Sequence, residues 1–179
     1  MSDARDQFTK VAVVFLLAGA IGFGVLEGNG GASRVKKGTP APSFKVDRLT
    51  GGTATIDELS GKVVLLAFWG TWCPPCREEL PYLVSIADEY KDKGATLLAV
   101  NDADEDRANM PDYVEHQLPG LKPYAAWGNP EIFRNYGIES MPQLYLLSTS
   151  GSVIAHWGGF EGPGEIAAVR AKLDATLKR

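Results

Sequence analysis

The stretch that decides the fold is KVVLLAFWGTWCPPC, at positions 62–76. Its first part, Lys62–Trp69, is a near-continuous apolar run of the length of a buried strand. The two cysteines of the chain, Cys73 and Cys76, follow it and lie where the strand gives way to a helix, one sulfur at the helix N-terminus and the other one turn along. The helix is indicated by apolar residues that recur on one face, namely Leu80, Leu83, Ile86, Ala87 and Tyr90.

This placement of the cysteines favours reversible thiol–disulfide chemistry over three simpler interpretations. A zinc site needs about four ligands, and the chain has no second cysteine pair and only His116 and His156, far apart in the sequence. A purely structural disulfide would close a ring of four residues and contribute roughly 2 kcal/mol before strain. Two unpaired core cysteines would not need the Pro-Pro sequence between them.

Length and charge limit the function classes. A chain of 179 residues fits one domain of about 150 residues with an appendage. The net charge of −4 comes without a basic stripe, which argues against a nucleic-acid partner.

The appendage is N-terminal. Residues 11–26 carry no charge, and the 19 residues from Phe8 to Leu26, in helical form, span about 28 Å, close to the roughly 30 Å hydrocarbon core of a bilayer. We therefore predict a membrane anchor over residues 1–27 and a flexible tether over residues 28–37. A cleaved signal peptide is the alternative, with a possible cleavage site after Gly30-Gly31-Ala32.

Residues 38–179 are predicted to form one α/β domain with a mixed central sheet and helices on both faces. The acidic stretch 102–106 is expected to be a solvated loop, and Pro81 is expected to kink or restart the helix after the cysteines. The expected strands are 44–49 and 53–56, which form a hairpin, then 62–69, 95–101, 143–147 and 152–157. The other expected helices lie near 110–117, 130–136 and 164–177.

The chain resembles the thioredoxin superfamily, and within it the membrane-anchored TlpA/ResA/CcmG-like thiol–disulfide oxidoreductases. The resemblance covers roughly residues 38–177, and the segment between Asn101 and Met141 looks like the central insertion of this branch. The residues that carry it are GTPAPSF (38–44), GKVVLLAFWGTWCPPC (61–76), YGI (136–138) and Met141-Pro142.

The resemblance implies a thioredoxin-like fold and a reductase of disulfides in exported proteins, such as apocytochrome c or proteins of oxidase assembly. The enzyme would be a single-pass protein of the cytoplasmic membrane, with its catalytic domain in the periplasm or on the outer face. Its electrons would come from an integral-membrane thiol donor, and it would need no cofactor beyond the cysteines.

The roles of the cysteines follow from their positions. As the N-cap of the helix, the Cys73 sulfur is favoured as a thiolate and can accept a hydrogen bond from the Cys76 N–H. Cys73 is thus predicted to attack a substrate disulfide, and Cys76 to resolve the mixed disulfide. Pro74 and Pro75 suit the first helical turn but remove two amide donors, so we expect only moderate acidification of Cys73.

Other site residues are implied by the resemblance. Pro142 is expected to be a cis-proline that faces the cysteine pair, and the backbone of Met141 to pair with the substrate. Met141 stands where Thr or Val is common, which suggests a different partner surface. Trp72, Pro74 and Pro75 beside the cysteines, together with Gly158, complete the expected substrate-binding surface.

Glu79 is the candidate acid–base group. It matches an acid of the ResA-like branch, whereas the buried acid of thioredoxin proper is replaced by Ala67. One turn after Cys76, a part-buried carboxyl group could have a raised pKa and exchange protons with that sulfur. The alternative is a solvated acid in the first turn of a helix.

Two other functions remain open from the sequence. The cysteines could bind and deliver Cu(I), with His156 or Met141 as a third ligand. The segment from Pro40 to Phe44 also resembles peroxiredoxin-like peroxidases, although these use a different cysteine pattern.

Overall fold

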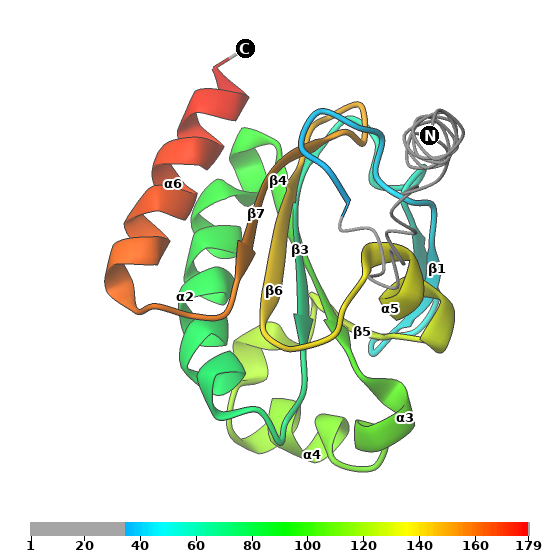
Figure 1. Cartoon of the computed structure of the whole chain (residues 1–179). Coiled ribbons are helices and arrows are strands. Elements are labelled where there is room, and N and C mark those ends of the chain that lie inside the picture. Colours follow the sequence, from blue (N-terminus) through cyan, green and yellow to red (C-terminus); the bar gives the residue numbers. More distant parts are fainter. Residues whose placement is uncertain (1–34, 179) are drawn as a thin grey trace, which may run out of the picture. The chain divides into compact units, whose positions relative to one another are not determined.

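A computed structural model describes residues 35–178, which form a mixed β-sheet with helices packed on it (Figure 1). Within these residues the sheet has seven strands in the order β2-β1-β5-β4-β3-β6-β7. The strands are β1 (Lys45–Arg48), β2 (Thr53–Thr55), β3 (Val63–Trp69), β4 (Ala95–Asn101), β5 (Ala125–Trp127), β6 (Gln143–Leu147) and β7 (Val153–Gly158). The α-helices are α2 (Pro74–Tyr90), α3 (Ala103–Asp106), α4 (Met110–His116), α5 (Pro130–Tyr136) and α6 (Pro163–Leu177), and short 3-10 turns span Lys91–Lys93 and Pro119–Leu121.

Strand β3 is the centre of the sheet. It pairs in parallel with β4 and antiparallel with β6, and all of its residues are buried. Both faces of this strand are covered, which explains why its sequence is continuously apolar instead of alternating with polar residues. Its carboxyl end, Trp69, leads directly to the cysteine loop.

Side chains from alternate positions of β3 enter two different apolar clusters. Val63, Leu65, Ala67 and Trp69 pack with α2, α4 and α6, whereas Val64, Leu66 and Phe68 pack with α5 on the other face. Figure 1 shows α2 and α6 on one side of the sheet and α5 on the other. The predicted mixed sheet with helices on both faces is therefore confirmed.

Several local predictions need correction. The acidic stretch 102–106 is not a solvated loop: residues 103–106 form α3, and Asp106 is fully buried because the helical turn directs its carboxylate inward to polar partners. Of the two alternatives for Pro81, the restart is wrong, because helix α2 continues through it to Tyr90. Strand β5, between β1 and β4, was not predicted, since three residues give too little pattern to detect.

The predicted membrane anchor at residues 1–27 lies outside the described residues, as does most of the predicted tether. None of the helices between residues 35 and 178 is both long and apolar enough to cross a bilayer.

The buried face of α2 gives a stability prediction. Leu83 is fully buried in the cluster between α2 and the sheet, so Leu83→Ala should lower the free energy of unfolding by about 2–5 kcal/mol, measured by urea denaturation. Ser85 is exposed on the same helix, and Ser85→Ala should change it by less than about 0.5 kcal/mol. Equal losses in the two variants would show that this face is wrongly assigned.

Candidate active site

The two cysteines form a disulfide at the N-terminus of α2, where the carboxyl end of β3 leads into the helix. Cys73 is the N-cap residue, with extended backbone angles, and its Sγ accepts a hydrogen bond of 3.3 Å from the Cys76 N–H. Pro74 and Pro75 occupy the first helical turn, where their missing N–H groups cost little. The predicted cap geometry is confirmed.

The two sulfur-bearing residues differ in their access to solvent. Cys73 is 3% exposed and Cys76 is 0% exposed. Trp72 beside them is 50% exposed, and Pro74 and Pro75 are also exposed. A protein that approaches the disulfide therefore meets an apolar, accessible rim and reaches Cys73 first.

Pro142 lies at the same end of the sheet. Strand β6 starts at Gln143, opposite Phe68 near the end of β3, so Pro142 is level with the loop that leads to the cysteines. The Met141–Pro142 peptide bond is cis, as the resemblance implied. Met141 is partly buried against both apolar clusters.

Gly158 lies next to Pro142 across the β6–β7 pair. It is opposite Gln143, and the following Gly159 N–H donates a 2.9 Å hydrogen bond to the Pro142 carbonyl. The structure thus brings Trp72, Pro74, Pro75, Met141, Pro142 and Gly158 to one end of the sheet, around the disulfide.

A buried polar network that the sequence did not reveal fixes the loop before Cys73. The Asp106 carboxylate accepts hydrogen bonds from the Thr71 N–H at 2.6 Å, from the Thr71 hydroxyl and from the Asn101 side-chain amide at 2.7 Å. Asp106 is fully buried, so these bonds replace its lost hydration. The signal in the sequence is a run of acids directly after a buried strand, a pattern that also predicts a solvated loop.

Glu79 is buried, with 2% of its surface exposed, which contradicts the alternative of a solvated acid in a first turn. Its Oε1 has no hydrogen-bond partner among the described residues. Burial, and to a smaller extent the charge of Glu165, raises the pKa of Glu79 from 4.5 to about 8. At neutral pH this side chain is therefore mostly a neutral acid, one helical turn from Cys76, that can donate a proton.

The other residues considered from the sequence lie outside this constellation. His116 is exposed and contacts Asp112 on its own helix. His156 stacks on Tyr145 and bonds to Gln143 Oε1 at 2.6 Å. No group of three or more His, Cys, Asp or Glu side chains in residues 35–178 is arranged to hold a metal ion.

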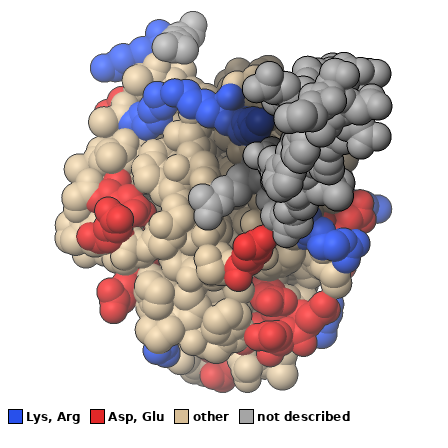
Figure 2. Space-filling view, in the orientation of Figure 1, with Lys and Arg blue, Asp and Glu red and all other residues tan. Residues whose placement is uncertain are grey.

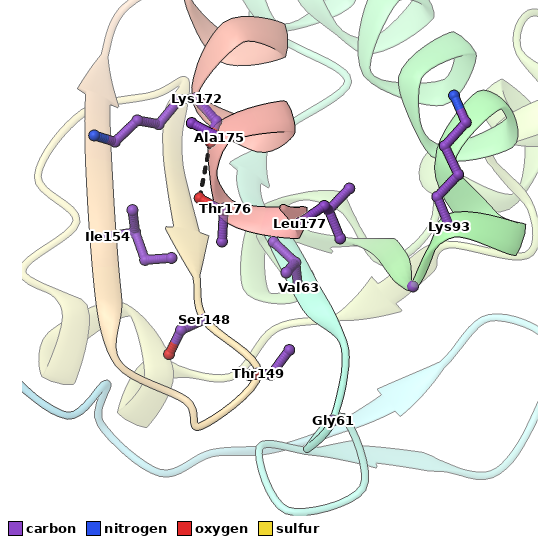
Figure 3. Close-up of a pocket in the computed structure, with 11 residues that line it drawn as sticks. Gly61, Val63, Lys93, Ser148, Thr149, Ile154, Lys172, Ala175, Thr176 and Leu177 are labelled. Atoms are coloured by element: carbon purple, nitrogen blue, oxygen red, sulfur yellow. Dashed lines mark hydrogen bonds between the residues drawn. The ribbon is translucent and has the colours of Figure 1, made fainter. Parts of the chain in front are cut away.

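A cavity of about 560 Å³ lies at the opposite end of the sheet from the disulfide. It is lined by Gly61 and Val63, where β3 begins, and by the last turns of α6. In Figure 3 the side chains of Lys93 and Lys172 point away from the centre of this cavity, so their charged groups do not converge on a ligand there. A smaller hollow of about 330 Å³ adjoins the cysteine loop and is lined by Thr71, Arg77, Asn109, Asp112, Tyr113 and Gln117.

Acidic side chains mark one side of the cysteine end. Asp104 and Glu105 of α3 are exposed, and α3 is joined to the cysteine loop through Asp106. In Figure 2 acidic residues gather at the lower right, over the place where Figure 1 draws α3.

A disulfide between an N-cap cysteine and a residue one turn along, beside a cis-proline on a mixed sheet, defines a thioredoxin-like thiol–disulfide oxidoreductase. The comparisons with known proteins agree with this class. The chain belongs to the AhpC/TSA family, whose model matches residues 37–156.

The curated relatives support the same enzyme class. The chain is 35% identical over 147 residues to the thiol–disulfide oxidoreductase ResA of Bacillus thuringiensis, covering 81% of this chain and 83% of that protein. It is 32% identical over 162 residues to ResA of Halalkalibacterium halodurans, covering 88% and 90%. A crystal structure of a putative thiol:disulfide interchange protein DsbE from Chlorobium tepidum superposes with a TM-score of 0.73 at 30% identity, covering 80% of this chain and 99% of that one.

The Asp106 network gives a prediction for the active-site loop. Asp106→Asn removes the negative charge from hydrogen bonds that hold the loop and leaves one acceptor oxygen in place of two, so we expect a loss of about 1.5–3 kcal/mol of unfolding free energy, measured by chemical denaturation. Asp104→Asn, on the exposed side of the same helix, is the matched control and should have little effect. A loss no larger than that of the control would mean that the network does not hold the loop.

The buried Glu79 predicts a pH-dependent stability. Between pH 4.5 and about 8 the folded protein keeps a proton that the unfolded chain releases, so the free energy of unfolding falls as pH rises and levels off above about pH 8. Glu79→Gln removes this term, and its stability relative to wild type should increase by ~4 kcal/mol between pH 4 and pH 9. The measurement is denaturation of the disulfide-bonded protein, in which the thiols do not titrate, with exposed Glu78→Gln as control. Parallel stability curves for wild type and Glu79→Gln would contradict a raised pKa.

Proposed function

We propose that this enzyme reduces disulfides in exported proteins, with Cys73 as the attacking and Cys76 as the resolving cysteine. The observation that carries the proposal is the unequal environment of the two cysteines. Cys73 is the more exposed of the two. Its sulfur accepts a hydrogen bond from the Cys76 N–H at the N-terminus of the helix, which stabilises a thiolate. Cys76 is fully buried, one turn from a neutral acid.

The first step forms a mixed disulfide. The Cys73 thiolate attacks one sulfur of the substrate disulfide, a bond forms between them, the substrate S–S bond breaks, and one substrate sulfur leaves as a thiolate. Trp72, Pro74, Pro75, Met141, Pro142 and Gly158 surround the site of attack and would contact the substrate chain.

The second step releases the substrate. Cys76 loses its proton and attacks the Cys73 sulfur, which gives the intramolecular disulfide and expels the second substrate sulfur. Two electrons have then passed from the enzyme to its substrate. Glu79 is the group we assign to exchange this proton: its ionised form takes up the Cys76 proton, and its protonated form returns one to Cys76 when the enzyme is reduced again.

The surface and the resemblance to the ResA-like branch support a proposed substrate class. Exposed acids Asp104 and Glu105 beside the cysteine loop favour positively charged protein partners by electrostatic complementarity. Apocytochrome c before haem attachment is the substrate that the resemblance to the ResA-like branch suggests, with proteins of oxidase assembly as a second possibility.

Re-reduction of the enzyme requires an external dithiol. We assign this role to an integral-membrane thiol donor, which would attack Cys73, the accessible end of the disulfide. This fits an enzyme tethered through residues 1–27 to the cytoplasmic membrane, with residues 38–179 as the catalytic domain in the periplasm or on the outer face. The apolar, uncharged residues 11–26 support the anchor.

The trapping variant tests the assignment of the cysteines. In Cys76→Ser the resolving thiol is missing, so the full-length protein should accumulate mixed disulfides through Cys73 with a disulfide-containing peptide and with partners in cells, detected on non-reducing gels. Cys73→Ser is the matched control and should trap at least about tenfold less, because Cys76 is buried.

Equal trapping on both cysteines would overturn the role assignment, and no trapping at all would overturn the proposed exchange reaction. The redox state in cells separates the direction of electron flow: thiol alkylation should find Cys73 and Cys76 mostly reduced. A mostly oxidised pair would make the enzyme an oxidant.

A further inference from the structure

The start of α6 packs over the part of α2 that carries Glu79. The rings of Tyr82, one turn after Glu79, and Phe160, in the loop before α6, have centroids 6.0 Å apart. Ile166 and Val169 of α6 are buried in the same apolar cluster as Cys76 and Leu80 of α2. The first turn of α6 is thereby held against the helix face below the disulfide.

Two carboxyl groups meet at this contact without a basic partner. Glu79 Oε1 and Glu165 Oε1 are both buried and have no hydrogen-bond partner among the described residues. Glu165 is also close enough for its charge to raise the pKa of Glu79. Two carboxylates placed together in this way repel each other, whereas a proton on one of them relieves the repulsion.

The two carboxyl groups differ in their route to solvent. Glu79 is almost completely enclosed, whereas Glu165 is only partly buried. Glu165 Oε2 accepts a 3.3 Å hydrogen bond from the backbone N–H of Glu161, an exposed residue of the loop. Glu165, whose charge acts on Glu79, is thus itself hydrogen-bonded to an exposed loop.

The charged groups around the pair are acidic. Within the described chain, the group whose charge acts on Glu79 is Glu165, and the group whose charge acts on Glu165 is Glu161. Burial and the Glu161 charge raise the pKa of Glu165, while the Glu161 N–H lowers it. Arg77 and Glu78, the neighbours of Glu79 on α2, are exposed.

We propose that Glu165 is a positioning residue for Glu79: its carboxyl group keeps Glu79 protonated at neutral pH and is the group through which Glu79 exchanges protons with solvent. The proposal deepens the proposed function, since it rests on proton exchange between Glu79 and Cys76. When a dithiol attacks Cys73, the S–S bond breaks, Cys76 leaves as a thiolate and takes the proton of Glu79. The Glu165 carboxylate then takes up a proton from water and passes it to Glu79, which restores the charged Glu165 and the protonated Glu79.

The direct test is carboxyl ¹³C NMR titration of the full-length, disulfide-bonded protein. Glu165→Gln should lower the titration midpoint of Glu79 by about one pH unit, because a like charge has been removed. Glu79 is still protonated and uncharged while Glu165 titrates, so Glu79→Gln should leave the midpoint of Glu165 nearly unchanged. Glu78→Gln removes an exposed charge one residue away and should move neither midpoint by more than about 0.2 units. A Glu79 midpoint unchanged by Glu165→Gln overturns the pairing.

Kinetics test the proton route separately. The rate at which dithiothreitol reduces the Cys73–Cys76 disulfide is measured as a function of pH. The rate of each variant is divided by the wild-type rate at the same pH, so that the effect of dithiothreitol ionisation cancels. For Glu165→Gln the ratio should be near one below about pH 6 and fall at least about twofold between pH 7 and 8, where Glu79 would have lost its proton. The ratio for Glu78→Gln should stay flat.

The possible failures can be told apart. If the Glu165→Gln ratio is flat while Glu79→Gln slows the reaction, Glu165 is not the positioning residue but Glu79 keeps its role. If Glu79→Gln matches wild type at every pH, the acid–base role of Glu79 in the proposed function is wrong, and with it the proton route through Glu165. Circular dichroism of each variant confirms that the comparison is made on folded protein.

Discussion

The rest of the site depends on how the first turn of α2 is fixed at the carboxyl end of β3. A short loop joins a fully buried strand to a helix with a buried face, and the Asp106 carboxylate holds that loop through Thr71. Gly70 contributes in another way, because a Cβ at this position would lie 2.8 Å from the Trp72 ring. With the loop fixed, the Cys76 amide is aimed at the Cys73 sulfur and Trp72 is presented to solvent.

The same helix places its two sulfurs in opposite electrostatic surroundings. At Cys73 the Cys76 N–H and the positive end of the helix favour a negative sulfur. Near Cys76 the surroundings are apolar and contain Glu79, whose burial and proximity to Glu165 disfavour further negative charge. A thiolate is therefore stabilised at the outer sulfur and a protonated thiol at the inner one. The division between attacking and resolving cysteine follows from position along one helical turn.

The sequence predicted the core of the fold because its strongest signals are local. These signals depend only on residues that are neighbours in the chain: the apolar run of β3, the periodic apolar face of α2, and the glycines and prolines that end the other elements. Asp106 and β5 could not be predicted in this way, since the partners of Asp106 are Thr71 and Asn101, and β5 is recognisable only by its place between β1 and β4. The sequence indicates Glu79 as a candidate, but its raised pKa also depends on Glu165 of α6, at the far end of the chain.

The position of the site at the carboxyl end of β3 and β4, and not in the cavity at the other end of the sheet, has a physical reason. Thiol–disulfide exchange with a protein substrate needs an accessible sulfur on a surface that another chain can approach, so an enclosed volume offers no advantage. At this end the helix start, the cis-Pro142 segment and the exposed Trp72 converge on one sulfur. At the other end the 560 Å³ cavity is lined by ordinary loop and helix-end residues, with lysines that point away from it (Figure 3). The reactivity of the cysteine pair is thus determined by the electrostatic field and the solvent exposure at the N-terminus of one helix.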